Sequence, residues 1–106
     1  MSYMYCMSDT ILVLQALAEP TRMAAIRQLW NADEHCVCEL MQQLGATQSR
    51  MSRHMAQLRR AGLVVDRRDA LWIRDRRHPG LSPTISAVVD AALASLPQAD
   101  RRGRVA

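Results

Sequence analysis

Lysine and phenylalanine are both absent from this 106-residue sequence, in which all 14 basic residues are arginine. Arginine presents a planar fork of donors that suits phosphate and guanine, so its exclusive use favours bidentate contacts. No apolar run reaches the roughly 18 residues that a membrane span requires. The first residues, MSYMYCMSD, lack the basic start and apolar stretch of a secretory signal. We therefore expect a cytoplasmic protein with no membrane partner.

Cysteine is scarce as well. The three cysteines are an odd number, which argues against a disulfide framework, and thiols in the cytoplasm stay mostly reduced. The chain is long enough for one small domain, and 49% of its residues are hydrophobic, which allows a packed core. We expect residues 1–97 to form that domain. Residues 98–106 have no periodicity, so a disordered basic tail is expected there.

Charge is concentrated in the middle of the chain. Residues 1–49 carry two arginines against five acidic residues, residues 50–77 carry nine against three, and residues 78–106 carry three against two; the balances of −3, +6 and +1 sum to the net charge of +4. A concentrated basic segment suggests a polyanionic partner. The alternative is an arginine-rich face that is only solvated.

Five helices and one β-hairpin are predicted from hydrophobic spacing and cap residues. The helices are expected at residues 9–17, 20–30, 36–44, 48–60 and 83–96, and the strands at 63–67 and 71–75 around a turn at 68–70. The expected N-caps are Glu19, Thr47 and Ser82. His35 is expected in a solvent-facing loop. The predicted fold class is mainly α with a small β-hairpin (α+β).

A helix-turn-helix pattern is present at residues 36–60: a short helix, a glycine-containing turn, and a second helix that starts with small polar residues and arginine. The basic hairpin that follows predicts the winged version. The side chains expected to read base edges in double-stranded DNA are Gln48, Ser49, Ser52 and His54, while Arg50 and Arg53 are expected to reach guanine or phosphate. The side chains expected to hold the flanking phosphates are Arg67, Arg68, Arg74, Arg76 and Arg77.

The stretch HCVCEL places two thiols at a predicted helix start. Cys36 stands where serine or aspartate would be the usual cap, and Glu39 follows at capping-box spacing. Because the first residue is not yet helical, the sulfurs of Cys36 and Cys38 can turn toward one ion, and a helix N-terminus favours thiolate. The alternatives are two small buried hydrophobes and a DNA-binding protein without inducer. A thiol oxidoreductase is disfavoured, because the motif is Cys-x-Cys and not Cys-x-x-Cys.

Four stretches resemble, in order, the ArsR/SmtB family of metal- and metalloid-responsive repressors: LAEPTRMAAIRQL, CVCELMQQL, TQSRMSRHMAQLRRAGLV and RRDALWIRD. The resemblance implies a homodimeric winged helix-turn-helix repressor, not an enzyme, that leaves its operator when an inducer binds. Cys36 and Cys38 match the family's Cys-Val-Cys motif. The matches to its recognition-helix positions are Gln48, Ser49, Ser52 and His54.

Departures from the family pattern bear on the inducer. The arsenic-sensing pattern has a third cysteine shortly after the pair, which ELMQQL lacks. In one branch of the family, N-terminal cysteines of one subunit join the pair of the other, so the resemblance makes Cys6 the natural third ligand, from either subunit. Three thiolates suit As(III) or Sb(III); Cd(II) and Pb(II) are alternatives, as is a disulfide or persulfide response. No organic cofactor is expected. The zinc-sensing branch uses Asp and His on its last helix, where this chain has only Asp90.

The apolar stripe of the last helix is broader than one small core needs. Together with the first helix, it is expected to form a two-fold interface that holds the two reading helices about one DNA turn, roughly 34–36 Å, apart. The interface residues expected on the last helix are Ile85, Val88, Val89, Ala92, Leu93 and Leu96. Val89→Asp is expected to give monomers.

Overall fold

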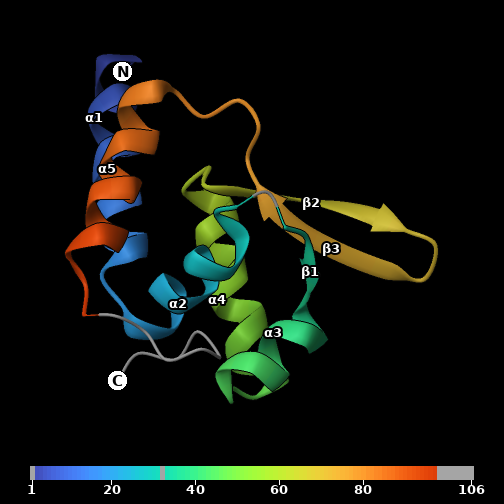
Figure 1. Cartoon of the computed structure of the whole chain (residues 1–106). Helices are drawn as coiled ribbons and strands as arrows, with labels where there is room; N and C mark the ends of the chain where they lie inside the picture. Colours follow the sequence, from blue (N-terminus) through green and yellow to red (C-terminus); the bar gives the residue numbers. More distant parts are fainter. Residues whose placement is uncertain (1, 32, 98–106) are drawn as a thin grey trace.

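The computed structural model describes residues 2–31 and 33–97, with residues 2–9 described by their backbone alone. Figure 1 shows α1 and α5 along one edge of the molecule, α2, α3 and α4 in its centre, and a β-hairpin that projects from the other side. The elements are α1 (Ser2–Leu17), α2 (Pro20–Leu29), β1 (His35–Cys36), α3 (Val37–Leu44), α4 (Gln48–Arg60), β2 (Val64–Asp69), β3 (Trp72–Arg77) and α5 (Pro83–Ser95). This is the predicted winged helix-turn-helix fold, although α1 begins seven residues earlier than predicted, at Ser2 instead of residue 9.

The expected tail at residues 98–106 lies outside the described residues. Within the described part of the chain, no helix has the length and apolar character needed to cross a membrane.

Local cap residues set the starts of three helices, as predicted. Glu19, Thr47 and Ser82 each accept a hydrogen bond from the backbone N–H three residues later, at 2.8, 3.3 and 3.2 Å. Gly45 ends α3 with a φ of 71°, a left-handed conformation that costs glycine little. The short turn from Gly45 to Thr47 therefore brings α4 directly back against α3.

The core lies where α4 meets the other helices. Met51, Met55 and Leu58 of α4 are all 0% exposed, as the predicted stripe requires, and Ile26 of α2 and Leu40 of α3 are equally buried. Because one side of α4 is fixed in the core, its opposite side faces solvent. The packing thus determines which residues of α4 are available to a partner.

The sheet has three antiparallel strands in the order β1-β3-β2. β2 and β3 are both longer than predicted, and the turn lies at residues 70–71 instead of 68–70. Asp69 and Trp72 form the last pair of the hairpin, and Ala70 takes a φ of 55° in the two-residue turn between them. The sequence predicts Asp69 in the turn, but in the structure Asp69 is the last residue of β2. This is possible because a two-residue hairpin turn accommodates a positive φ at its first residue, here Ala70.

β1 was not predicted. His35 and Cys36 pair with Asp75 and Arg74 of β3, so the expectation that His35 lies in a solvent-facing loop is wrong. The His35 side chain is only 15% exposed, and its two ring nitrogens are buried without a hydrogen-bond partner among the described residues. A strand of two residues has no alternation to detect, and its pairing depends on a hairpin about 40 residues later in the chain.

A buried ion pair fixes the hairpin to α4. Arg59 donates from Nε and Nη2 to the two carboxylate oxygens of Asp75 at 2.8 and 2.9 Å, and Asp75 is 0% exposed. Burial raises the pKa of Asp75, while the hydrogen bonds from Arg59 act in the opposite direction. The orientation of the hairpin relative to α4 therefore depends on one fully buried carboxylate.

Asp75→Asn is expected to lower the free energy of unfolding by about 1.5–3 kcal/mol, because it removes charged hydrogen bonds from a buried group. Urea denaturation followed by circular dichroism measures this loss. Asp66→Asn is the matched control: Asp66 lies 3.4 Å from the same guanidinium but is 48% exposed, so its loss should cost less than about 1 kcal/mol. Equal losses for the two variants would show that the buried pair has no special role.

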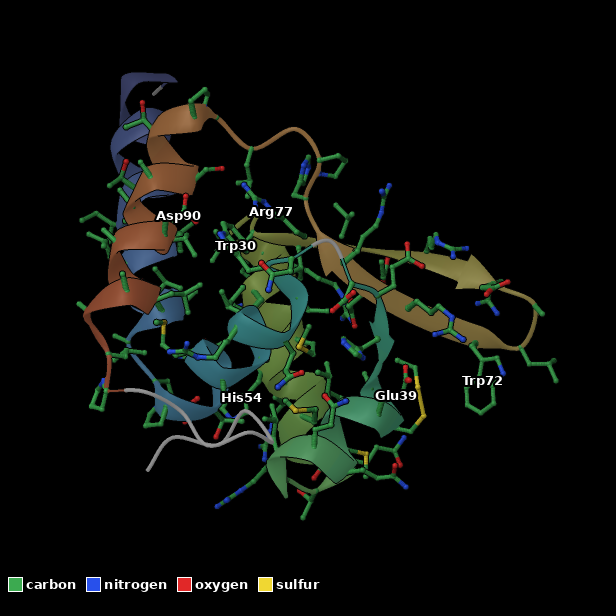
Figure 2. All side chains as sticks on the ribbon, viewed as in Figure 1. Trp30, Glu39, His54, Trp72, Arg77 and Asp90 are labelled. Carbon is green, nitrogen blue, oxygen red and sulfur yellow. A yellow bond between two sulfur atoms is a disulfide. The ribbon has the colours of Figure 1, made fainter. Side chains whose placement is uncertain are left out.

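Arg77 anchors the other end of β3 to the helices. Its guanidinium lies 4.0 Å from the centroid of the Trp30 ring and donates to the Trp30 carbonyl at 3.2 Å and to the Ser86 hydroxyl at 2.9 Å. Trp30 in turn donates from Nε1 to Asp90 at 2.6 Å, so these side chains link β3, α2 and α5 (Figure 2). The predicted phosphate contact of Arg77 stays a prediction, and in this structure its guanidinium binds inside the protein.

Candidate DNA-binding surface and thiol site

The first half of α4 presents a polar surface to solvent. Its inward side is occupied by Met51 and Met55. The exposed side chains include most of those predicted to contact DNA from this helix: Gln48, Ser49, Arg50, Ser52 and Arg53. An amide, two hydroxyls and two guanidinium groups within two helical turns supply the donors and acceptors that base edges require. The structure thus brings these five residues together on one accessible surface.

His54 differs from these neighbours because its side chain is only 20% exposed. Its Nδ1 lies 3.2 Å from Nη1 of Arg22 and 3.7 Å from Oε2 of Glu19. Arg22 is buried and also donates to the carbonyls of Ala16 and Gln15 at the end of α1, at 2.6 and 3.2 Å. Burial opposes ionisation of Glu19, but backbone hydrogen bonds at the start of α2 and the nearby positive groups lower its pKa. His54 therefore lies in a contact between α4, α2 and α1, apart from the exposed surface.

Glu34 binds two of the hairpin arginines. Arg67 donates from Nε and Nη2 to its carboxylate at 2.6–3.0 Å, and Nε of Arg76 lies 3.9 Å from it. The hydrogen bonds from Arg67 lower the pKa of Glu34, with burial acting against them, and they raise the pKa of Arg67. These arginines, predicted to hold phosphates, are engaged with a carboxylate in this structure.

The two remaining hairpin arginines lie on opposite faces. Arg74 donates from Nε to Asp69 at 3.3 Å and from Nη1 to Glu39 at 3.5 Å. Arg68 is exposed and pairs across the hairpin with Ile73, on the face away from Arg74. Apart from Arg77, three of the predicted phosphate-binding arginines lie beside carboxylates, namely Arg67, Arg74 and Arg76, and both Arg67 and Arg68 are exposed.

Cys36 and Cys38 meet at the start of α3. Cys36 is the extended N-cap, and its backbone N–H donates to Glu39 at 2.9 Å. A disulfide joins the two sulfurs, with Cα atoms 5.4 Å apart, and is drawn as a yellow bond close to Glu39 in Figure 2. Both sulfurs therefore turn to one point, as the cap geometry predicts. The pair is thus close enough to be linked, either directly or through one ion.

The two cysteines differ in accessibility. Cys36 is buried, with 6% of its surface exposed, whereas Cys38 is exposed. Among the side chains that the structure describes, no group of three His, Cys, Asp or Glu residues is placed to hold a metal ion. Cys6 lies in the part of α1 described by its backbone alone, so its role as a third ligand stays a prediction.

The apolar stripe of α5 faces mainly into the protomer. Val89 is 0% exposed, so its assignment to a dimer interface is wrong: a side chain without accessible surface does not contact a partner. Four other predicted interface residues are partly buried against the same core: Ile85, Ala92, Leu93 and Leu96. Val88 is half-buried. The large apolar side chains that the structure shows exposed on this edge lie on α1, where Ile11 is 51% and Leu14 47% exposed.

The contacts of Glu34 and Glu39 were not foreseen, except for the cap at Cys36. A usable signal was present, because one acidic residue precedes the Cys-Val-Cys segment by two positions and another follows it directly, while arginines alternate along the predicted strand from residue 74. Detecting the contacts required the pairing of β1 with β3, which no local pattern gives.

Comparison with known proteins gives consistent similarities. Residues 19–65 match the family described as "Bacterial regulatory protein, arsR family". The chain is 40% identical over 84 residues to the arsenic resistance transcriptional regulator ArsR1 of Pseudomonas putida, covering 76% of this chain and 66% of that one. It is 34% identical over 82 residues to the arsenical resistance operon repressor of Escherichia coli, covering 77% and 70%. Among solved structures, reduced HlyU from Vibrio cholerae is similar, with a TM-score of 0.72, 26% identity, and coverage of 92% and 98%.

Proposed function

Because the chain belongs to the ArsR family of bacterial regulatory proteins, we propose that it is a transcriptional repressor released from its operator by trivalent arsenic or antimony bound to cysteine thiolates. Membership makes it a DNA-binding regulator and not an enzyme. The aligned part spans 66% and 70% of two relatives named for arsenic resistance, so the inducer, the operator and the homodimer belong to the proposal. The protein would act in the cytoplasm, where operator DNA is found.

The observation that carries the proposal is the position of the thiol pair. Cys36 is the N-cap of α3, and the exposed Cys38 is the second residue of that helix. α3 packs against α4, to which it is joined by a short turn that ends at Thr47. An ion held by both sulfurs fixes the first turn of α3 and thereby biases the position of the reading helix. For release, the ion must bind the DNA-free conformation more tightly than the DNA-bound one.

The chemistry of the pair fits a thiophilic trivalent ion. Two sulfurs reach one point, and the helix N-terminus favours their thiolate forms. Arsenous acid loses one hydroxide as water for each thiol that binds, and the thiol supplies the proton, so no oxidant is required. Cys6 is proposed as the third ligand, from the same or the other subunit of a dimer. Cadmium and lead are the alternative ions.

One titration tests the function. The reduced protein, bound to a fluorescent operator fragment, is titrated with arsenite, antimonite and cadmium while anisotropy is recorded. We expect arsenite and antimonite to release DNA at roughly one ion per thiol site. Release by cadmium alone would assign the site to that metal, and no release by any of the three ions would overturn the proposal.

The second candidate is a thiol-redox repressor of the same fold, favoured by the Cys36–Cys38 disulfide itself. Oxidation would then replace the ion as the signal. Diamide treatment separates the two candidates: release by diamide, reversed by dithiothreitol, without release by arsenite under reducing conditions, supports the redox reading.

The readout of DNA is expected to divide between α4 and the hairpin. Ser52→Ala or Arg53→Ala should weaken operator binding by about 1–3 kcal/mol while leaving non-specific binding almost unchanged, because we propose that these exposed side chains read base edges. Arg68→Ala should weaken both kinds of binding alike and lower the slope of log K against log salt by about one. Competition assays with operator and random DNA at several salt concentrations measure both effects. If Arg68→Ala changed the sequence preference, base readout would have to be assigned to the hairpin instead of α4.

A further inference from the structure

Carboxylates on both sides of the thiol pair hold the arginines of the hairpin. Glu34 lies two residues before Cys36, and Glu39 follows Cys38 directly. Glu34 accepts from Arg67 and lies near Arg76, and Glu39 accepts from Arg74. We call these three arginines and two glutamates the wing clasp. The same arginines are the ones that DNA phosphates would otherwise attract.

The geometry of the sheet gathers the wing clasp on one face. Arg67 and Arg74 are paired directly across β2 and β3, and Arg76 follows Arg74 by two residues, so all three side chains lie on the same face. Like charges placed opposite each other repel, and the glutamates offset this repulsion. β1 supplies the connection, since Cys36 is the backbone partner of Arg74. A displacement of Cys36 is thus transmitted to the centre of the clasp.

Glu39 couples the clasp to the thiols directly. One oxygen, Oε1, accepts from the backbone N–H of Cys36 at 2.9 Å and lies 3.5 Å from Nη1 of Arg74. Both contacts depend on the first turn of α3, because Glu39 is its third residue and Cys36 is its cap. In this structure the two sulfurs are joined, the turn is closed, and all three arginines lie at glutamates.

We propose that Glu34 and Glu39 compete with DNA phosphates for Arg67, Arg74 and Arg76, and that joining Cys36 to Cys38 favours the glutamates. The inference rests on the proposed function for the identity of the natural signal, but any link between the sulfurs serves it, whether an arsenic ion or a disulfide. The signal then reaches DNA through the hairpin as well as through α4. Glu34 and Glu39 are positioning residues: they alter DNA binding by withdrawing arginines from it.

The salt dependence of operator binding tests the wing clasp. Each phosphate contact contributes about 0.9 to the slope of log K against log salt, so withdrawing up to three arginines should reduce that slope by roughly one to three. We expect the reduction when arsenite is added to the reduced wild-type protein. We expect it also when the pair is oxidised with diamide in a Cys6→Ser background, which prevents other disulfides within the chain.

Removing the carboxylate charges should keep the arginines available. In the Glu34→Gln/Glu39→Gln variant, glutamine still accepts from Cys36 and preserves the cap. This variant should retain its salt slope when the sulfurs are joined, and the ratio of operator Kd values with joined and free sulfurs should fall about tenfold. Asp33→Asn is the control for losing one carboxylate charge from the same segment, because Asp33 is exposed there, and it should behave as wild type.

The outcomes separate the inference from the proposed function. If arsenite does not release the wild-type protein, but oxidation lowers the slope of log K against log salt, the wing clasp is supported and the proposed inducer is rejected. If joining the sulfurs by either route releases DNA without changing the slope, or if the double variant responds as wild type does, the clasp is overturned. Arsenite binding by the double variant, followed by ultraviolet absorption of the sulfur–arsenic bonds, confirms that its thiol site is intact.

Discussion

Cys36→Ser is expected to stay on its operator at arsenite concentrations that release the wild-type protein. Serine supplies a hydroxyl cap at the start of α3 and removes one ligand, so DNA binding without inducer should be at least as tight as in wild type. Metal–thiolate sites owe several kcal/mol to each ligand, so the arsenite needed for half-release should rise by at least about 100-fold. Anisotropy of a labelled operator, measured with the reduced protein, gives both quantities.

Substitution of the other two cysteines tests whether each of them is a ligand. Cys38→Ser should be equally insensitive to arsenite, without the benefit to the cap. Cys6→Ser is the sharper test, because only ligation argues for Cys6: a strong loss of arsenite affinity with intact DNA binding assigns it as the third ligand. A normal response of Cys6→Ser would leave two protein thiols, with the third position filled by solvent, a small thiol or a methyl group on the arsenic. If all three variants still release DNA with arsenite, the metalloid proposal is wrong.

Leu14→Asp is expected to give a folded monomer that fails to bind a palindromic operator. Leu14 and Ile11 are about half exposed on α1, so a carboxylate there meets water in the monomer but would be desolvated in a two-fold interface. A monomer engages one half-site, and affinity should fall toward the non-specific level, by about 1,000-fold or more. Light scattering reports the oligomeric state, and gel-shift titration reports the affinity.

Val89→Asp provides the contrast. Val89 is fully buried within one protomer, so aspartate there should lower the free energy of unfolding by about 3–5 kcal/mol and abolish binding through loss of folding. Circular dichroism separates the two variants, since Leu14→Asp should keep the helical signal and a cooperative thermal transition, which Val89→Asp should lose. A dimer that survives Leu14→Asp would place the interface elsewhere.

Local chemistry predicted most of the helices and the exposed side of α4 well. Glu19, Thr47 and Ser82 act within one turn of their own positions, and the stripe of Met51 and Met55 fixes the exposed side of α4 without reference to the rest of the chain. These signals depend on nearest neighbours, which a sequence displays directly.

The features that could not be foretold depend on contacts between distant segments. β1 is too short to show a pattern, and its partner Arg74 is 38 residues beyond Cys36. Arg77 looks like any other hairpin arginine until Trp30 is seen beneath it. Val89 belongs to an apolar stripe that is wide enough both to fill the core and to form a dimer interface. Only the packed structure shows that Val89 is part of the core of one protomer.

The two sulfurs sit under unequal constraints, which has consequences for how such a sensor diverges or is re-engineered. Cys36 is at once a strand residue, a helix cap and a donor to Glu39, so a substitution there must satisfy three geometries. Cys38 is exposed and bound by none of them. In the proposed sensor, ligand specificity is therefore easiest to retune at Cys38 or at the proposed third ligand, Cys6. Insertion of one residue between the cysteines would rotate Glu39 by about 100° around the helix relative to Cys36. Binding at the sulfurs would then no longer be coupled to the hairpin arginines through Glu39.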